Sequence, residues 1–157
     1  MKIKLTPQLA YLAGIIKYSK IKNAVGVEGP QQLIEIFLKH ILDNDIIEPQ
    51  KIIIKKKKVY LKNIKLKSFL KKILDEEVER FKYHNDYAAS FLAGLYDFVG
   101  EEEENYVILN KTDQKDRMVL INLGFFIEER GKKTLVGPKD LFIKFIKNYS
   151  KKLEKTK

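Results

Sequence analysis

The first half of the chain alternates between stretches with helical and with strand-like spacing of its apolar residues. Stripes at intervals of three and four residues predict helices over residues 7–18, 31–44 and 66–81. Thr6 supplies a cap for the first helix and Pro7 its first residue, and Gly29-Pro30 opens the second helix. Residues 25–27 favour at most a short strand, and the apolar runs 52–54 and 59–61 predict a hairpin with lysines at its turn.

The second half follows the same order of elements. We predict a helix over residues 86–99, capped by Asn85 and ended by Gly100, and then a strand over residues 106–109. A helix capped by Thr112, a hairpin over residues 125–136 and a last helix after Gly137-Pro138 complete this half. Residues 101–104 are expected to form a charged connector and residues 151–157 a basic, solvated tail. The segments 21–29 and 101–111 each leave room for one good strand.

Two stretches that lie 80 positions apart have similar sequences. Residues 10–20 read A-Y-L-A-G-I-I-K-Y-S-K, and residues 90–100 read S-F-L-A-G-L-Y-D-F-V-G. A glycine inside a helix costs about 1 kcal/mol relative to alanine, and small residues offset this cost where two helices pack closely. Ala13-Gly14 and Ala93-Gly94 therefore predict that two repeated helices cross at these positions, in the centre of a molecule with pseudo-twofold symmetry.

These stretches resemble the motif of the LAGLIDADG homing endonuclease family. Leu92, Ala93, Gly94 and Leu95 match its first four positions, Asp97 the sixth and Gly100 the ninth, and Leu12, Ala13 and Gly14 match in the first copy. The order of elements also resembles the α-β-β-α-β-β-α repeat of the family over nearly the whole chain. The resemblance implies an α+β fold of two repeats, residues 1–82 and 83–150. The motif helices would pack at the centre of one compact unit with small antiparallel sheets.

Both motif copies lack the acid that the family uses in catalysis. In the family the metal-binding acid is the eighth motif residue, which here is Ser19 in the first copy and Val99 in the second. Asp97 stands at the sixth position, which is not the metal ligand in the family. A two-metal nuclease needs carboxylates from both repeats at the scissile phosphate. We therefore expect no catalytic residue, no bound metal and no cofactor, and we interpret the protein as a catalytically inactive relative.

Composition and charge indicate a polyanionic partner. The 157 residues are 45% hydrophobic and 33% charged, as in a folded domain, and the absence of cysteine excludes disulfides and thiolate metal sites. The net charge is +10, of which residues 1–80 carry +8 and residues 81–157 carry +2.

No apolar run is long enough to span a membrane, and no signal peptide is recognisable. We expect a cytoplasmic monomer, and the Lys-, Glu- and Ile-rich composition suits a thermophile.

The most basic segment is residues 51–72, with ten lysines and no acid. Lysines on a hairpin and on the following helix can contact phosphates and release counterions. The lysines that we expect to bind nucleic acid are Lys51, Lys55, Lys56, Lys57, Lys58, Lys62, Lys65 and Lys67. Only three arginines are present, so bidentate reading of guanine is not indicated. Inactive relatives include transcription regulators, and some members of the family assist RNA splicing; we favour DNA slightly over RNA.

Two other functions stay open at this point. A residual metal-dependent endonuclease would hold Mg²⁺ with Glu101–Glu104, chiefly Glu101 and Glu103, together with Glu28 or Asp97. Alternatively, the fold serves as a protein-interaction scaffold, and the lysines only keep it soluble. His40 and His84 stand alone, without a His or Cys at metal-ligand spacing, and we expect core or surface roles for both.

Overall fold

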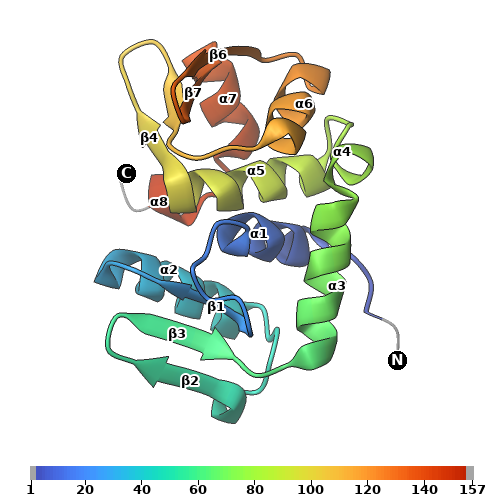
Figure 1. Ribbon diagram of the computed structural model, residues 1–157, viewed down its shortest axis with the longest axis vertical. Helices are drawn as coiled ribbons and strands as arrows, with labels where there is room; N and C mark the ends of the chain where they lie inside the picture. The colour runs from blue at the N-terminus through green and yellow to red at the C-terminus, as the bar shows by residue number, and fades with distance from the viewer. Residues whose placement is uncertain (1–2, 155–157) are drawn as a thin grey trace.

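The computed structural model describes residues 3–154 as two halves that meet along a pair of central helices (Figure 1). The first half contains, in chain order, α1 (Pro7–Ile16), β1 (Val25–Glu28), α2 (Gln31–Asp43), a 3-10 turn (Pro49–Lys51), β2 (Ile52–Lys55), β3 (Lys58–Leu61), α3 (Ile64–Asp75) and α4 (Glu77–Arg80). The second half contains α5 (Asp86–Val99), β4 (Gly100–Glu102), β5 (Val107–Leu109), α6 (Gln114–Asn122), β6 (Phe126–Arg130), β7 (Lys133–Gly137), α7 (Lys139–Ile146) and α8 (Lys151–Glu154). No helix in this described part of the chain has the length and apolar character needed to cross a bilayer.

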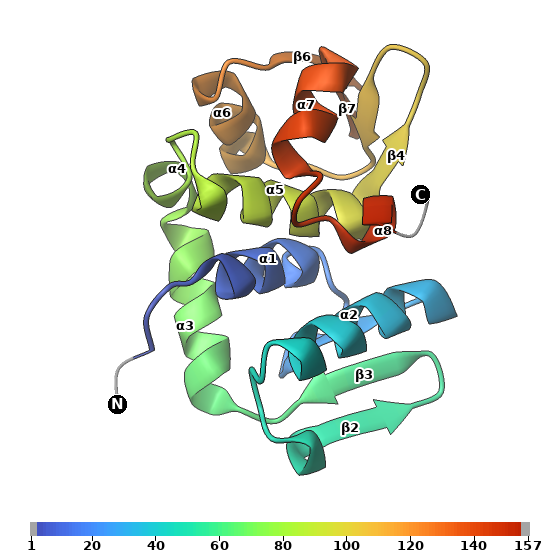
Figure 2. The same cartoon turned by 180° about the vertical axis from the view of Figure 1, so that it is seen from behind.

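Each half contains one small antiparallel sheet. The strand order is β1-β3-β2 in the first sheet and β4-β5-β7-β6 in the second. The apolar side chains of β1 and β3 are fully buried beneath α2, which lies across the back of the first sheet (Figure 2). Because side chains alternate between the two faces of a strand, Glu28, Lys58 and Tyr60 lie on the opposite face, which no helix of residues 3–154 covers.

The motif helices α1 and α5 pack backbone to backbone at their glycines. A methyl group added to Gly14 would lie 2.2 Å from the Phe91 carbonyl oxygen, and one added to Gly94 would lie 2.1 Å from the Tyr11 carbonyl oxygen. Tyr11 and Phe91 are themselves equivalent positions in the two motif copies, so the contact is reciprocal. The motif helices therefore cross at Gly14 and Gly94, and one hydrophobic core extends from this helix pair into both halves.

Three of the four predicted helix caps are confirmed. The side chains of Thr6 and Asn85 accept hydrogen bonds from the backbone amides of Leu9 and Ala88, and Gly100 ends α5. The prediction that Thr112 caps α6 is wrong. Asp113 is the cap, in a capping box with Asp116, because each of the two carboxylates accepts a hydrogen bond from the backbone amide of the other residue. The Thr112 hydroxyl instead hydrogen-bonds the Thr134 hydroxyl of β7.

Three other expectations are corrected by the backbone. Residues 100–102 form strand β4 rather than a connector, because they pair with β5, so only the first half is limited to one strand before its second helix. The helix predicted over residues 66–81 is divided between α3 and α4. Residues 151–154 are helical and bury Leu153, so they are not a solvated tail; residues 155–157 lie outside the described residues.

Candidate nucleic-acid interface

The helix-free face of the first sheet is basic. In the antiparallel register Lys55 lies opposite Lys58, and Ile53 lies opposite Tyr60. Tyr60 in turn lies opposite Gly26, where an added Cβ would come within 2.5 Å of the Tyr60 Cβ, so glycine provides the space for the aromatic side chain on this face. The Lys55 ammonium lies 5.9 Å from the centre of the Tyr60 ring. One aromatic ring and its neighbouring lysines thus form a continuous surface.

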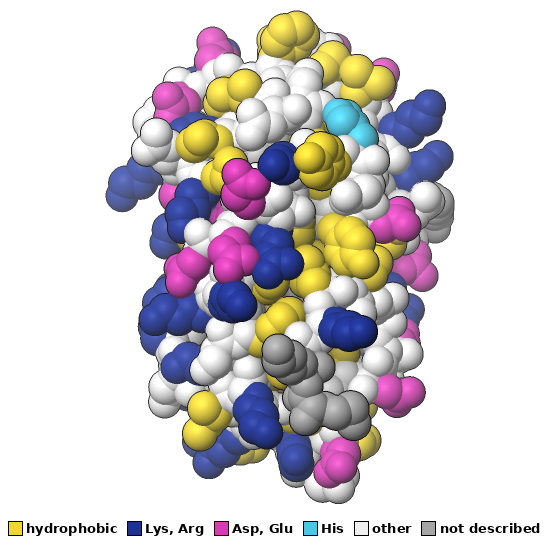
Figure 3. Space-filling model, turned by 90° about the vertical axis from the view of Figure 1, so that its right-hand side faces the viewer, with side chains coloured by type: hydrophobic (Ala, Val, Ile, Leu, Met, Phe, Trp, Pro, Cys, Tyr) yellow, Lys and Arg dark blue, Asp and Glu magenta, His cyan; other side chains and the backbone are white. Residues whose placement is uncertain are grey.

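A groove of about 740 Å³ runs along this surface. Its walls come from the segment after α1, from the sheet, and from the start of α3. The lining residues are Lys20, Ile21, Lys22, Asn23, Ala24, Glu28, Lys55, Lys58, Tyr60, Lys62, Asn63, Ile64 and Lys67. Six of these are lysines and only Glu28 is acidic. From the side on which α3 lies, basic side chains gather along the left margin of the lower half of the molecule (Figure 3).

The structure brings together half of the lysines that the sequence singled out. Lys55, Lys58, Lys62 and Lys67 line the groove, whereas Lys51, Lys56, Lys57 and Lys65 do not. The groove also contains two lysines outside the segment 51–72, namely Lys20 and Lys22. The sequence signal for Lys20 and Lys22 was their position between the first motif helix and strand β1, because this segment leads directly into the first sheet.

The second sheet presents a different surface. On its helix-free face Glu101 lies opposite Ile108, Ile108 lies opposite Leu135, and Leu135 lies opposite Glu128. Phe126 of the edge strand β6 is 75% exposed on the same face. The two halves therefore share a fold but not a surface, since one sheet is basic and the other is apolar and acidic.

The eighth motif positions carry no carboxylate and are largely buried. The Ser19 hydroxyl donates a hydrogen bond of 2.7 Å to the Gly26 carbonyl oxygen and accepts one of 3.1 Å from the Ile21 amide. Ser19 therefore fixes the turn that leads from α1 to β1. Val99 is 9% exposed and belongs to the apolar core.

The sixth motif position of the second copy supports the C-terminal helix. Asp97 is buried and accepts hydrogen bonds from the Ser150 hydroxyl at 2.5 Å and from the Lys151 amide at 2.8 Å, at the start of α8. It also accepts a hydrogen bond of 2.5 Å from the Tyr11 hydroxyl of α1. Burial raises the pKa of Asp97, although the hydrogen bonds from Ser150 and Tyr11 oppose that shift. These contacts assign Asp97 a structural role.

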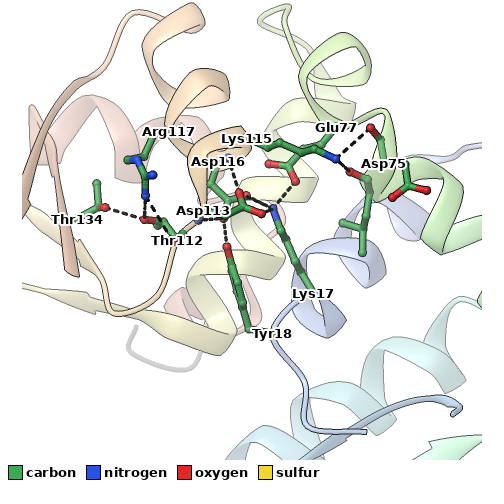
Figure 4. A network of polar contacts seen from close by, with 11 residues as sticks. Lys17, Tyr18, Asp75, Glu77, Thr112, Asp113, Lys115, Asp116, Arg117 and Thr134 are labelled. Carbon is green, nitrogen blue, oxygen red and sulfur yellow. Dashed lines mark hydrogen bonds and ion pairs between the residues drawn. The ribbon is translucent and has the colours of Figure 1, made fainter. Parts of the chain in front are cut away.

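The sixth motif position of the first copy lies in an acidic cluster between the halves. The Lys17 ammonium is 2.5 Å from Glu77 of α4, 2.8 Å from Asp113 at the α6 cap and 2.7 Å from Asp116 of α6 (Figure 4). The Tyr18 hydroxyl donates a short hydrogen bond to Asp116. Glu77 and Asp116 are fully buried, and the Lys17 side chain is 9% exposed. We call Lys17, Glu77, Asp113 and Asp116 the Lys17 cluster.

Burial and close charges shift the pKa values in the Lys17 cluster. Burial raises the pKa of Glu77, and the nearby Asp116 carboxylate adds to the shift. Burial alone would lower the pKa of Lys17, but the charges of Asp116 and Glu77 outweigh it and raise the pKa. The Lys17 cluster therefore holds a firmly charged ammonium among three acids. Sequence reasoning missed it, because its acids are far apart in the chain.

The acids proposed for a residual nuclease do not come together. Among residues 3–154 the one group of three carboxylates with oxygen atoms within 4.8 Å of one another is Glu77, Asp113 and Asp116. Glu101 and Glu103 are exposed at the second sheet, and Glu28 lies in the groove of the first. Asp97 is occupied by its hydrogen bonds inside the protein.

Comparison with known proteins identifies the fold. No protein-family model and no curated protein sequence matches the chain. Among solved structures, I-DmoI in complex with DNA and Mn superposes with a TM-score of 0.59 and 19% identity over 92% of this chain and 97% of that chain. The complex of I-DmoI with DNA and Ca gives a TM-score of 0.56 and 20% identity over 91% and 88% of the two chains. Mesophilic variants of the homing endonuclease I-DmoI give 0.59 and 18% over 89% and 94%. The chain therefore has the LAGLIDADG homing endonuclease fold that its repeated motif predicted.

Proposed function

We propose that this protein binds nucleic acid, with DNA favoured over RNA, through the groove of its first half, and that it does not cleave the bound strand. The observation that carries the proposal is the set of six groove lysines. None of them forms an ion pair with an acid in the part of the chain that the structure describes, whereas Lys17, Lys82, Lys139 and Lys151 all do. Unpaired lysines on one surface are free to neutralise phosphates.

The residues between the lysines add a limited capacity to contact bases. Asn23 lines the groove and can hydrogen-bond base edges, whereas the Asn63 side-chain oxygen is engaged as the cap of α3; the half-buried Tyr60 offers a ring for stacking. No arginine lines the groove. These features support binding dominated by phosphate contacts, in which affinity depends strongly on salt and weakly on sequence. The preference for DNA is supported by the similarity to I-DmoI structures that contain DNA.

The absence of cleavage is supported by the ends of the motif helices. Metal ions at a scissile phosphate require carboxylates there, and the eighth positions offer a hydroxyl and an isopropyl group. The Ser19 hydroxyl is already engaged with Gly26, and Val99 packs in the core. The residues present therefore do not fit the metal centre of a LAGLIDADG nuclease.

The binding site is tested by a triple variant in which Lys55, Lys58 and Lys62 are replaced by glutamine. Each lost phosphate contact lowers the slope of log K against log salt by about 0.9 on duplex DNA, so the triple variant is expected to lower it by about 3. Fluorescence anisotropy on a labelled duplex, repeated over a range of salt concentrations, measures this slope. A slope equal to that of the wild type would refute the assignment of the groove.

The matched control changes three exposed lysines that do not line the groove, namely Lys71, Lys72 and Lys147, to glutamine. It removes the same net charge, so only the place of the charge differs. We expect it to retain most of the wild-type slope. An equal loss in the two variants would mean that the interaction reports net charge alone. Incubation of the same duplex with Mg²⁺ or Mn²⁺ is expected to leave it intact on a denaturing gel.

A protein partner is the second candidate, favoured by the apolar and acidic face of the second sheet. Phe126 and Tyr106 are 75% and 43% exposed there. If the triple variant of Lys55, Lys58 and Lys62 binds nucleic acid as the wild type does, and neither protein prefers one polyanion over another, a scaffold for a protein partner explains the structure better.

A further inference from the structure

The Lys17 cluster has the geometry of a cation site. Three carboxylates from two helices surround one positive charge at 2.5 to 2.8 Å, and α4 and α6 belong to different halves of the molecule. Oxygen ligands at about 2.0–2.6 Å are what Mg²⁺ and Ca²⁺ require. Figure 4 shows the three side chains converging on the Lys17 ammonium from α4 and α6.

The three carboxylates of the Lys17 cluster offer more hydrogen-bond acceptors than the single ammonium of Lys17 can fill. Glu77 is fully buried, and its Oε2 has no hydrogen-bond partner among the described residues. Asp116, also fully buried, accepts hydrogen bonds from Lys17, from Tyr18 and from the Asp113 amide. An unpartnered buried carboxylate oxygen beside two further carboxylates is a position where a second positive charge would be stabilised.

We propose that the ammonium of Lys17 occupies a divalent-cation site between the two halves, and that Glu77, Asp113 and Asp116 bind one divalent cation when that ammonium is removed. The cation would take hard oxygen ligands and therefore belong to the class of Mg²⁺, Ca²⁺ and Mn²⁺. In the wild-type protein the ammonium joins α1, α4 and α6 without a metal. This inference is independent of nucleic-acid binding in the groove, which lies on the helix-free face of the first sheet.

Access for a metal ion is provided by Asp113. Its side chain is 46% exposed, whereas the side chains of Glu77 and Asp116 are fully buried. An ion can therefore reach the cluster from solvent through Asp113 and complete its coordination there with water, as Mg²⁺ and Mn²⁺ do at protein sites.

The test replaces Lys17 with methionine, which keeps most of the length of the side chain but removes its charge. Isothermal titration with MnCl₂ is expected to show one Mn²⁺ per chain for Lys17→Met, with affinity at least about tenfold above that of the wild type. Bound Mn²⁺ should also raise the midpoint of thermal unfolding of the variant and leave that of the wild type nearly unchanged.

Two controls make the result specific. Lys82→Met makes the same chemical change at an exposed ion pair with Glu79, and it should leave Mn²⁺ binding at the wild-type level. Lys17→Met combined with Glu77→Gln removes one ligand and should lose the gained affinity. Equal Mn²⁺ binding by the wild type and Lys17→Met, or by Lys17→Met and the double variant, would overturn the proposal.

Loss of the ammonium can also unfold the protein, because three carboxylates would then face one another. In that case addition of Mn²⁺ should restore the far-ultraviolet circular dichroism of Lys17→Met, since a cation that binds only the folded state stabilises it. Lys17→Gln, which retains a hydrogen-bond donor, serves as the second variant. If both variants stay unfolded at millimolar Mn²⁺, the cluster does not take a divalent cation and the proposal is wrong.

Discussion

Gly14 and Gly94 lie where the Cβ atom of any larger residue would not fit. Each faces a backbone carbonyl of the opposite motif helix, so neither position has room for a Cβ. The usual stability cost of glycine in a helix is about 1 kcal/mol, and the close packing that the glycines allow between the two helix backbones offsets it. The sequence alone allowed this inference, because the same Ala-Gly pair occurs twice at half-chain spacing.

Gly14→Ala is expected to lower the free energy of unfolding by about 3 kcal/mol, since the added methyl group forces α1 and α5 apart. Gly94→Ala should cost a similar amount, because the contact is reciprocal. Once the helices have separated, the second methyl group has room, so the double variant should cost less than the sum of the single variants. Denaturant unfolding of the three variants measures these values. Losses below 1 kcal/mol in both single variants would contradict the close crossing.

His40 links stability to pH through its burial in α2. Its Nε2 lies 2.8 Å from the Gln8 carbonyl oxygen and its Nδ1 lies 3.3 Å from the Asn44 amide nitrogen, so the neutral ring has a partner at each nitrogen. Burial lowers the pKa of His40 to about 4, against an ordinary value of 6.5. The unfolded chain therefore binds a proton more readily than the folded protein between these two values.

We expect the contribution of His40 to the free energy of unfolding to fall by up to roughly 3 kcal/mol as the pH drops from 6.5 towards 4. His40→Gln should be less stable at pH 7 and show a flatter dependence across this range. His84→Gln, at the other and exposed histidine, should keep the wild-type dependence. Unfolding in urea at a series of pH values provides the comparison, and an unchanged slope in His40→Gln would refute this role.

At the scale of elements, the two sixth motif positions attach peripheral helices to the central pair. Asp97 binds the first amides of α8, where a negative charge is favoured by the helix dipole. Lys17 contacts α4 and α6, and the Lys115 ammonium of α6 adds a hydrogen bond of 3.2 Å to the Asp75 carbonyl at the end of α3 (Figure 4). The motif helices therefore organise the halves through charge as well as through close packing.

Asp97→Asn should destabilise the protein by about 2 kcal/mol, because its amide nitrogen would replace one acceptor oxygen and face two donors, either Ser150 with the Lys152 amide at Oδ1 or Tyr11 with the Lys151 amide at Oδ2. Tyr11→Phe removes only the cross-helix hydrogen bond to Asp97 and should cost about 1 kcal/mol. Hydrogen exchange should show faster opening of α8 in Asp97→Asn than in Tyr11→Phe. Similar protection of α8 in the two variants would contradict the anchoring role.

The elements that the sequence predicted well are those with local signals. Caps such as Thr6 and Asn85 act within four residues, and apolar stripes mark the buried side of each helix, so α1, α2, α5 and α7 could be placed from the sequence. β4 could not be recognised, because its three residues include two glutamates and it exists only by pairing with β5. The error at Thr112 arose because the adjacent Asp113 is an equally good cap, and the choice depends on Lys17 and Asp116.

At the scale of the whole molecule, the first half carries most of the net positive charge, and the helix-free face of its sheet is basic. The corresponding face of the second sheet is apolar and acidic. The predicted role of the lysine segment stays a prediction, and strand alternation places only Lys55, Lys58, Lys62 and Lys67 of its predicted residues in the groove. The Lys17 cluster was beyond prediction, since it combines residue 17 with residues 77, 113 and 116, and only the folded chain brings these together.

The unlike faces of the two sheets have a consequence for direction. An assembly of two identical chains would present the same surface twice and could be entered from either end. In this chain a ligand that extends along both sheets meets lysines at one end and Phe126, Glu101 and Glu128 at the other. The surface therefore has a direction of its own, from basic to acidic, and we expect a polyanion to be held on the first half and kept away from the second sheet.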